Sequence, residues 1–115
     1  MADYYERIAK LQTSVGVNPL TQSEVLYTVP SMTMIIGKLF ILNPSASTAR
    51  AVSVSLSDAD TPAASEFIMY GNSVAAVTTV EVPGICLQAG KRLTVHSNAV
   101  GAIFVLTGLR ISGGA

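Results

Sequence analysis

The side chains best suited to chemistry in this sequence are one histidine, one cysteine and two closely spaced aspartates. His96 follows Arg92 and Thr94 in an alternating segment, and no nucleophile-elbow signature supplies a serine or cysteine for it to activate. We therefore interpret it as a surface or interface histidine. Cys86 lies in the apolar run Ile85-Cys86-Leu87, which predicts a buried, inert thiol. One cysteine and one histidine cannot complete a four-coordinate zinc site.

Asp58 and Asp60 have the spacing with which a calcium loop begins. An EF-hand would next need more oxygen ligands, a glycine and a closing glutamate, but Pro62 and two alanines follow. A solvated loop is the better interpretation. Glycine-rich phosphate motifs are absent and the seven acidic residues are scattered. The sequence therefore predicts a protein that is not an enzyme and needs no cofactor or metal.

The composition of the 115-residue chain predicts one domain that lies against neighbours. Only 12% of the residues are charged, about half the usual fraction, and seven basic side chains balance seven acidic ones. Without a basic stripe, direct binding to nucleic acid is not expected. No apolar stretch approaches the roughly 20 residues of a membrane span, and the N-terminus lacks signal-peptide character. We expect synthesis in the cytoplasm and no membrane partner.

The chain consists of short apolar or alternating segments separated by turn residues, as expected for an all-β antiparallel sandwich of about eight strands. We place the sandwich domain at residues 24–112, a flexible end at 113–115, and an arm or first strand at 1–23. The expected strands are 24–30, Met34–Leu42, Arg50–Ser57, Val74–Val82, Arg92–Ser97 and Ala102–Ile111.

Three local patterns refine this expectation. Alternation in Arg50–Ser57 predicts a buried valine and leucine side and a solvated serine side. Pro83-Gly84 is expected to end the strand that begins at Val74. Gln88-Ala89-Gly90-Lys91 predicts a tight turn in which Gly90 has a positive φ.

Two expected strands, Met34–Leu42 and Ala102–Ile111, are apolar on both sides. Such a strand lies either in a central position under loops or at a protein interface, and for a domain this small we favour the interface and cyclic self-association. The segment from Tyr4 to Leu11 fits a helical turn or an initial strand, and it either docks on a partner or covers the sandwich. The expected interface residues are Met34, Ile36, Phe40, Phe104, Leu106, Tyr4 and Tyr5.

Four segments, taken in order, resemble a small β-sandwich module of tailed-bacteriophage virions, which is jelly-roll-like. They are Leu26-Tyr27-Thr28-Val29-Pro30 followed by 33–36, Leu39-Phe-Ile-Leu-Asn43, Leu87-Gln-Ala-Gly90 with Leu93-Thr-Val-His-Ser97, and Phe104-Val-Leu-Thr-Gly108-Leu-Arg-Ile111. The chain departs from the module at Lys91 and Arg110, where acidic residues are common, and this puts inherited ion pairs in doubt.

The resemblance implies a virion structural protein without catalytic residues. The expected role is a head decoration or cement protein that binds the assembled head as a small oligomer, a trimer, and stabilises it. Its partners would be other copies of itself and the major capsid protein or other virion proteins, and its location the virion, assembled in the host cytoplasm. The alternatives are a tail, neck or fibre subunit, and a carbohydrate-binding sandwich.

Overall fold

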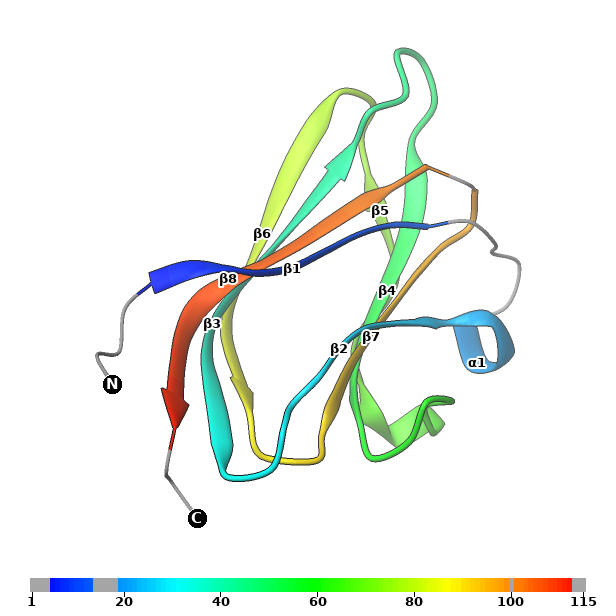
Figure 1. The fold of residues 1–115 in the computed structure, drawn as a ribbon. Coiled ribbons are helices and arrows are strands. Elements are labelled where there is room, and N and C mark those ends of the chain that lie inside the picture. Colours follow the sequence, from blue (N-terminus) through cyan, green and yellow to red (C-terminus); the bar gives the residue numbers. More distant parts are fainter. Residues whose placement is uncertain (1–4, 14–18, 100, 113–115) are drawn as a thin grey trace.

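A computed structural model describes residues 5–13, 19–99 and 101–112 of the chain. In these residues eight strands form two four-stranded antiparallel sheets packed as a sandwich (Figure 1). Sheet I has the order β1-β8-β3-β6, with β1 (Tyr5–Gln12), β8 (Ile103–Ser112), β3 (Thr33–Asn43) and β6 (Thr78–Leu87). Sheet II has the order β2-β7-β4-β5, with β2 (Glu24–Thr28), β7 (Arg92–Ser97), β4 (Arg50–Ser57) and β5 (Phe67–Val74). The all-β sandwich expected from the sequence is confirmed.

The strands pair in a nested order along the chain. β1 pairs with β8, β2 with β7, β3 with β6 and β4 with β5, all antiparallel. The β3–β8 and β4–β7 pairings then join these pairs into the two sheets. Figure 1 shows the first and last strands running side by side across one face of the molecule. Two short helical segments, α1 (Pro19–Gln22) and η1 (Ala64–Glu66), lie in the connections.

The core forms where the inner sides of the two sheets meet. Ile35, Leu39 and Ile41 of β3 are fully buried there, as are Phe104 and Leu106 of β8. Sheet II contributes the valine and leucine sides of its two central strands, which are Val52, Val54, Leu93 and Val95. Burial of each such side chain favours folding by about 1.5–3 kcal/mol. On β4 the buried valines belong to the side that period-2 alternation predicts, whereas β3 and β8 are apolar on both sides.

Two glycines allow β3 and β8 to approach closely at the centre of sheet I. Gly37 and Gly108 lie directly opposite each other in the pairing of the two strands. A Cβ at Gly37 would lie 2.1 Å from the Thr107 carbonyl oxygen, and one at Gly108 would lie 2.5 Å from the Ile36 carbonyl oxygen. Because these contacts are with backbone, no side-chain adjustment relieves them.

The turn expected at Gln88–Lys91 is confirmed, and it also holds the end of β2. Gly90 has φ 82°, and the Lys91 N–H donates to the Gln88 carbonyl at 3.1 Å. Val29 is hydrogen-bonded to this turn in both directions, donating to Lys91 O at 2.9 Å and accepting from Gly90 N at 3.0 Å. The Val-Pro segment therefore ends β2 by binding to the turn before β7.

Asn43 is the last residue of β3 and organises the loop that follows. Its side chain is buried, and the amide Nδ2 donates to the carbonyls of Thr48 at 2.9 Å and Val74 at 3.0 Å. The side-chain oxygen accepts from the N–H of Ser45 at 3.1 Å, which forms an Asx turn at Pro44. Asparagine at this position thus satisfies several backbone groups at once.

Two expectations about strand boundaries are corrected. Pro83-Gly84 does not end a strand, because β6 runs on to Leu87 with a register shift at this point, and an edge strand tolerates proline. Val74 ends β5, a strand that weak alternation did not predict, and Val77 lies in the following turn with φ 53°. Of the two alternatives for the N-terminal segment, a helical turn or an initial strand, the structure shows the strand, because residues 5–12 form β1 in sheet I. Tyr4 and residues 113–115 lie outside the described residues.

Candidate interaction surface

The side of sheet I that points away from the core is rich in apolar residues. We call it the outer face. On β3 and β8 every second residue belongs to it, and these residues are partly or largely exposed. The intervening residues whose burial is described are buried, except Thr33, Gly37 and Arg110, which are partly buried. Its apolar residues are Met34, Ile36, Phe40, Leu42, Ile103, Val105, Leu109 and Ile111.

Strand pairing arranges the outer face in rows across the sheet. One row runs Lys10, Val105, Phe40 and Glu81 from the β1 edge to the β6 edge. The next row toward one end runs Gln12, Ile103, Leu42 and Thr79. Toward the other end, a polar row of Arg7, Thr107 and Lys38 precedes a row of Leu109, Ile36 and Cys86. Two apolar patches are thus separated by a narrow polar belt.

The Lys38 charge in this belt is paired within the outer face. Lys38 Nζ lies 3.3 Å from Glu81 Oε1, and it lies 6.0 Å from the centre of the Phe40 ring. Both partners of the ion pair are substantially exposed, so the pair adds little to the stability of the monomer. Its effect is to lower the cost of covering this face, because a partner would meet a paired ammonium and not an isolated one.

The expected interface residues fall into two groups. Met34, Ile36 and Phe40 lie on the outer face. Phe104 and Leu106 do not, because both are fully buried between the sheets, and this corrects their expected interface role. The exposed side of β8 is instead the alternate set beginning at Ile103. The backbone of Tyr5 lies opposite Leu109 at the β1 edge, and Tyr4 is outside the described residues.

Cys86 also belongs to the outer face, where it lies beside Ile36. The thiol is exposed, so the expectation of a buried cysteine is wrong. Its neighbours Ile85 and Leu87 are buried, since successive strand residues point to opposite sides of the sheet. An apolar run on an edge strand therefore did not distinguish core from surface at its middle residue.

The outer side of sheet II is unlike that of sheet I, because its central strands carry small polar side chains that are buried. Ser53, Ser55 and Ser57 of β4 have at most 1% exposure, so the expected solvated serine side is wrong. The Ser55 and Thr94 hydroxyls are hydrogen-bonded to each other, and Gly71 N–H donates to Ser53 Oγ at 2.9 Å. Phe67 of β5 pairs with Ser55, and α1 lies next to β7.

His96 lies in the same buried polar region and not on the surface, which is a further correction. Its side chain is 3% exposed, it pairs across the sheet with Ser53, and its Nε2 has no hydrogen-bond partner among the described residues. Burial lowers the pKa of His96 below its ordinary value, and the Glu24 carboxylate opposes this effect only in part. A buried imidazole held neutral in this way fits a structural role.

Protonation of His96 gives a pH prediction. The folded-state pKa of His96 is lowered, so the unfolded chain binds the proton first as the pH falls. The contribution of neutral His96 to the stability of the fold is therefore complete above the ordinary pKa of about 6.5, and it decreases as the pH falls below that value. NMR titration of this single imidazole should give a lower pKa in the folded protein than in urea. Equal values in the two states, or stability that rises on acidification from pH 7 to 5, would contradict the assignment.

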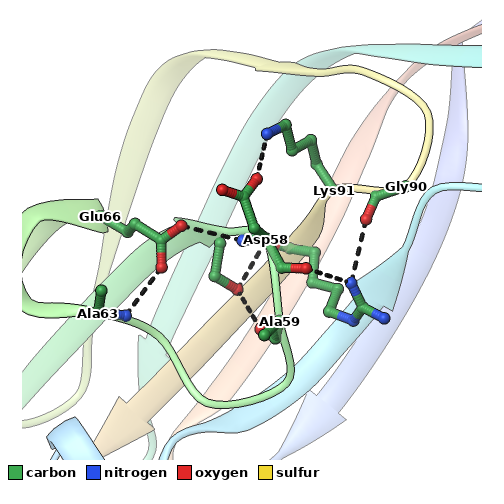
Figure 2. Close-up of polar contacts among 8 residues, drawn as sticks. Asp58, Ala59, Ala63, Glu66, Gly90 and Lys91 are labelled. Carbon is green, nitrogen blue, oxygen red and sulfur yellow. Dashed lines mark hydrogen bonds and ion pairs between the residues drawn. The ribbon is translucent and has the colours of Figure 1, made fainter.

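A cluster of charged residues joins the loop after β4 to the start of β7 (Figure 2). Lys91 forms an ion pair with Asp58, and Arg92 Nε lies 2.6 Å from Asp60 Oδ1. Glu66 accepts from the N–H groups of Asp58 and Ala63, at 3.0 and 2.8 Å. Figure 2 shows the Asp58 and Glu66 contacts side by side at the base of the loop. The two aspartates that resembled the start of a calcium loop are therefore paired with bases beside the turn before β7.

The pairing of Asp58 predicts a second titration result. The Lys91 ammonium lowers the pKa of Asp58 through a hydrogen bond and its charge, and Arg92 acts in the same direction. The contribution of the Asp58 ion pair to the stability of the fold is present above the ordinary pKa of the carboxyl, and it is lost as the pH falls through the lowered pKa. Replacing Lys91 with glutamine should raise the pKa of Asp58, as followed by carboxyl-carbon NMR. The matched variant Lys10→Gln should leave it unchanged.

A metal site and a membrane-spanning helix were both sought among the described residues. They contain no group of three or more histidine, cysteine, aspartate or glutamate side chains that could hold a metal ion. Within them, no helix has the length and hydropathy of a membrane span. Neither the scan against protein-family models nor the search of curated proteins gives a match for this chain. The outer face of sheet I is thus the feature on which a functional proposal rests.

Proposed function

We propose that this protein is a non-enzymatic structural protein of tailed-bacteriophage virions, a decoration or cement protein that binds the assembled head as a small oligomer, a trimer, and stabilises the shell. The observation that carries the proposal is the outer face of sheet I. It joins eight apolar side chains on two central strands, whereas the outer side of sheet II is a buried polar row. Apolar surface gathered on one side of a small protein is typical of an interaction site.

The strand order also supports this class of protein. The strands pair first with last, second with seventh, third with sixth and fourth with fifth, and this nested pairing supports the proposal of a jelly-roll winding. Viral capsid proteins and lectins both use this architecture, so the winding does not by itself identify a function. Combined with the four segments that resemble the phage module and with the low charge of the chain, it favours the virion role.

The proposed mechanism is an equilibrium effect. A protein that binds the assembled shell, and not its separated subunits, shifts the assembly equilibrium toward the shell. The stabilisation comes from apolar area that is removed from water when the outer face is covered. Such a role needs no catalytic group, and the only residues required are those that form the contact surface.

The experiment compares two matched isoleucines. Ile36 is 41% exposed on the outer face, and Ile68 is 49% exposed on β5 of sheet II. Stripped particles are mixed with wild type, Ile36→Asp or Ile68→Asp, and both binding and resistance of the particles to heat or chelators are measured. Ile36→Asp should weaken binding about a hundredfold, because a carboxylate would be buried in an apolar contact, whereas Ile68→Asp should behave as wild type.

Particle resistance and copy number per virion together distinguish a location on the head from one in the neck or tail. Particles whose resistance is unchanged by the wild-type protein would reject the cement role. Several hundred copies per virion would support a coat on the head, whereas six or twelve copies would indicate a neck or tail ring, the second candidate. Equal binding by the two isoleucine variants would show that the outer face is not the contact surface.

A further inference from the structure

We propose that copies of this chain associate edge to edge, with the β1 edge of one copy pairing antiparallel with the β6 edge of the next. This deepens the proposed function, since it rests on the self-association that the function includes. It specifies which strands form the contact between copies. It also leaves the outer face of sheet I free to bind another surface.

Strands β1 and β6 are the two edges of sheet I, and among the described residues each pairs with a strand on one side only. They also have compatible directions. β1 is antiparallel to β8, β8 to β3, and β3 to β6, so β6 runs opposite to β1. A second copy displaced sideways along the sheet would therefore place its β6 antiparallel to β1, and the alternation of strand directions would continue across the contact.

The regular parts of the two edges lie at the same level of the sheet. The β1–β8 register shifts between Arg7 and Ala9, and the β3–β6 register shifts near Pro83. Within the sheet, the irregular part of β1 therefore lies on the same side of Lys10 as the irregular part of β6 lies of Glu81. The remaining parts, 9–12 and 78–82, are without register shifts, and the rows of the sheet connect them. Bulges and proline protect the other half of each edge against pairing, so the available halves match each other.

The charges at this level are complementary. Lys10 and Glu81 are the two ends of one row across the sheet, through Val105 and Phe40. Side-by-side copies in register would place Glu81 of one copy directly opposite Lys10 of the next, a favourable cross-strand pair. Lys10 is exposed and has no ion-pair partner among the described residues. Glu81 binds Lys38 through Oε1, so its Oε2 remains for the second lysine.

The contact is heterologous, because it joins two different edges. It therefore closes into a ring or continues as a filament, and it does not stop at a twofold dimer. At the two edges of sheet I, β1 contacts β2 and β6 contacts β5 of the other sheet. These contacts do not bury the edge residues that face outward, which are Lys10, Gln12, Thr79 and Glu81. Sheet extension would also bring the outer faces of adjacent copies into one continuous apolar surface.

The first test is a charge swap followed by sedimentation over a range of concentrations. Lys10→Glu and Glu81→Lys should each weaken self-association about tenfold, and the double variant should restore it. Arg7→Glu is the matched control, because it makes the same charge change on β1 in a row with no acidic residue on β6. Melting temperatures confirm folding of each variant, which matters for Glu81→Lys because it places two lysines together. A monomeric wild type, an unrescued double variant or an equal effect of Arg7→Glu would overturn the proposal.

The second test counts the copies. Gln12→Cys and Thr79→Cys, in a Cys86→Ser background, would lie opposite each other across the contact at a separation that a disulfide spans. Oxidation of the protein with both substitutions should give a ladder of cross-linked species that ends at the ring size, whereas either one alone gives at most dimers. Self-association without a ladder rejects the edge contact and leaves the virion role intact. A ladder from protein that does not bind particles rejects the virion role alone.

Discussion

Replacing Gly37 with alanine is expected to lower the free energy of unfolding by about 3 kcal/mol or more. The added Cβ would lie 2.1 Å from the Thr107 carbonyl oxygen and 2.7 Å from the Gly108 Cα, both of which are backbone atoms. Strands β3 and β8 would have to separate at the centre of sheet I, and that movement would disturb the core on one side and the outer face on the other. Urea unfolding followed by circular dichroism measures the loss.

Gly84→Ala is the control for this variant. Gly84 has φ 76°, but no heavy atom lies within 4 Å of the position its Cβ would take. The cost there is limited to the left-handed backbone conformation, about 1–2 kcal/mol. If Gly37→Ala were no more destabilising than Gly84→Ala, the close approach of β3 and β8 at this point would be wrong.

Phe104→Ala and Phe40→Ala are expected to have opposite effects on folding and on association. Phe104 is fully buried between the sheets, so its truncation should cost about 3–5 kcal/mol and lower the melting temperature by roughly 12 °C or more. Phe40 lies partly exposed on the outer face, beside Val105, and its loss should cost about 1 kcal/mol or less in the monomer while weakening binding to particles.

Thermal unfolding and particle binding, measured on the same two preparations, separate these effects. Leu106→Ala supplies a second core variant, because it is buried in the same strand, and it should resemble Phe104→Ala in unfolding. A Phe40→Ala variant that unfolds as readily as Phe104→Ala would mean that the outer face is covered within the monomer itself. That result would remove the main support for the proposed contact surface.

The sequence pattern located most strands because alternation and turn residues are local properties. The two doubly apolar strands correspond to β3 and β8. Asn43 lies in a turn that its side-chain amide favours, and Gly90 lies in one that needs a positive φ. β5 was missed because Gly71 and Asn72 interrupt its apolar residues and its register shifts against β4. Local pattern is weakest where an edge strand is irregular.

The wrong predictions of side-chain burial have a different cause. Period-2 alternation tells which residues lie on one side of a strand, but not what covers that side. Ser55 was assigned to a solvated side and His96 to the surface or an interface because both are polar, yet both are buried on that side of sheet II. On β8 both sides are apolar, so periodicity offered no means of choosing between Phe104 and its alternate neighbours. The prediction that Cys86 is buried was wrong for the same reason. These choices depend on how the two sheets pack, which is a tertiary property.

The nested pairing of the strands has a consequence for how the molecule forms. β4 and β5 are close in the chain and can pair early, whereas β1 must wait for β8, which is nearly a hundred residues away. Contacts between residues so distant in sequence carry a high loop-closure entropy and make folding slow, on the order of milliseconds to seconds for all-β domains. Sheet I has β8 as one of its two central strands. During synthesis, β1 and β3 therefore remain without their shared neighbour until β8 has left the ribosome, so the surface proposed for assembly is among the last parts of the protein to exist.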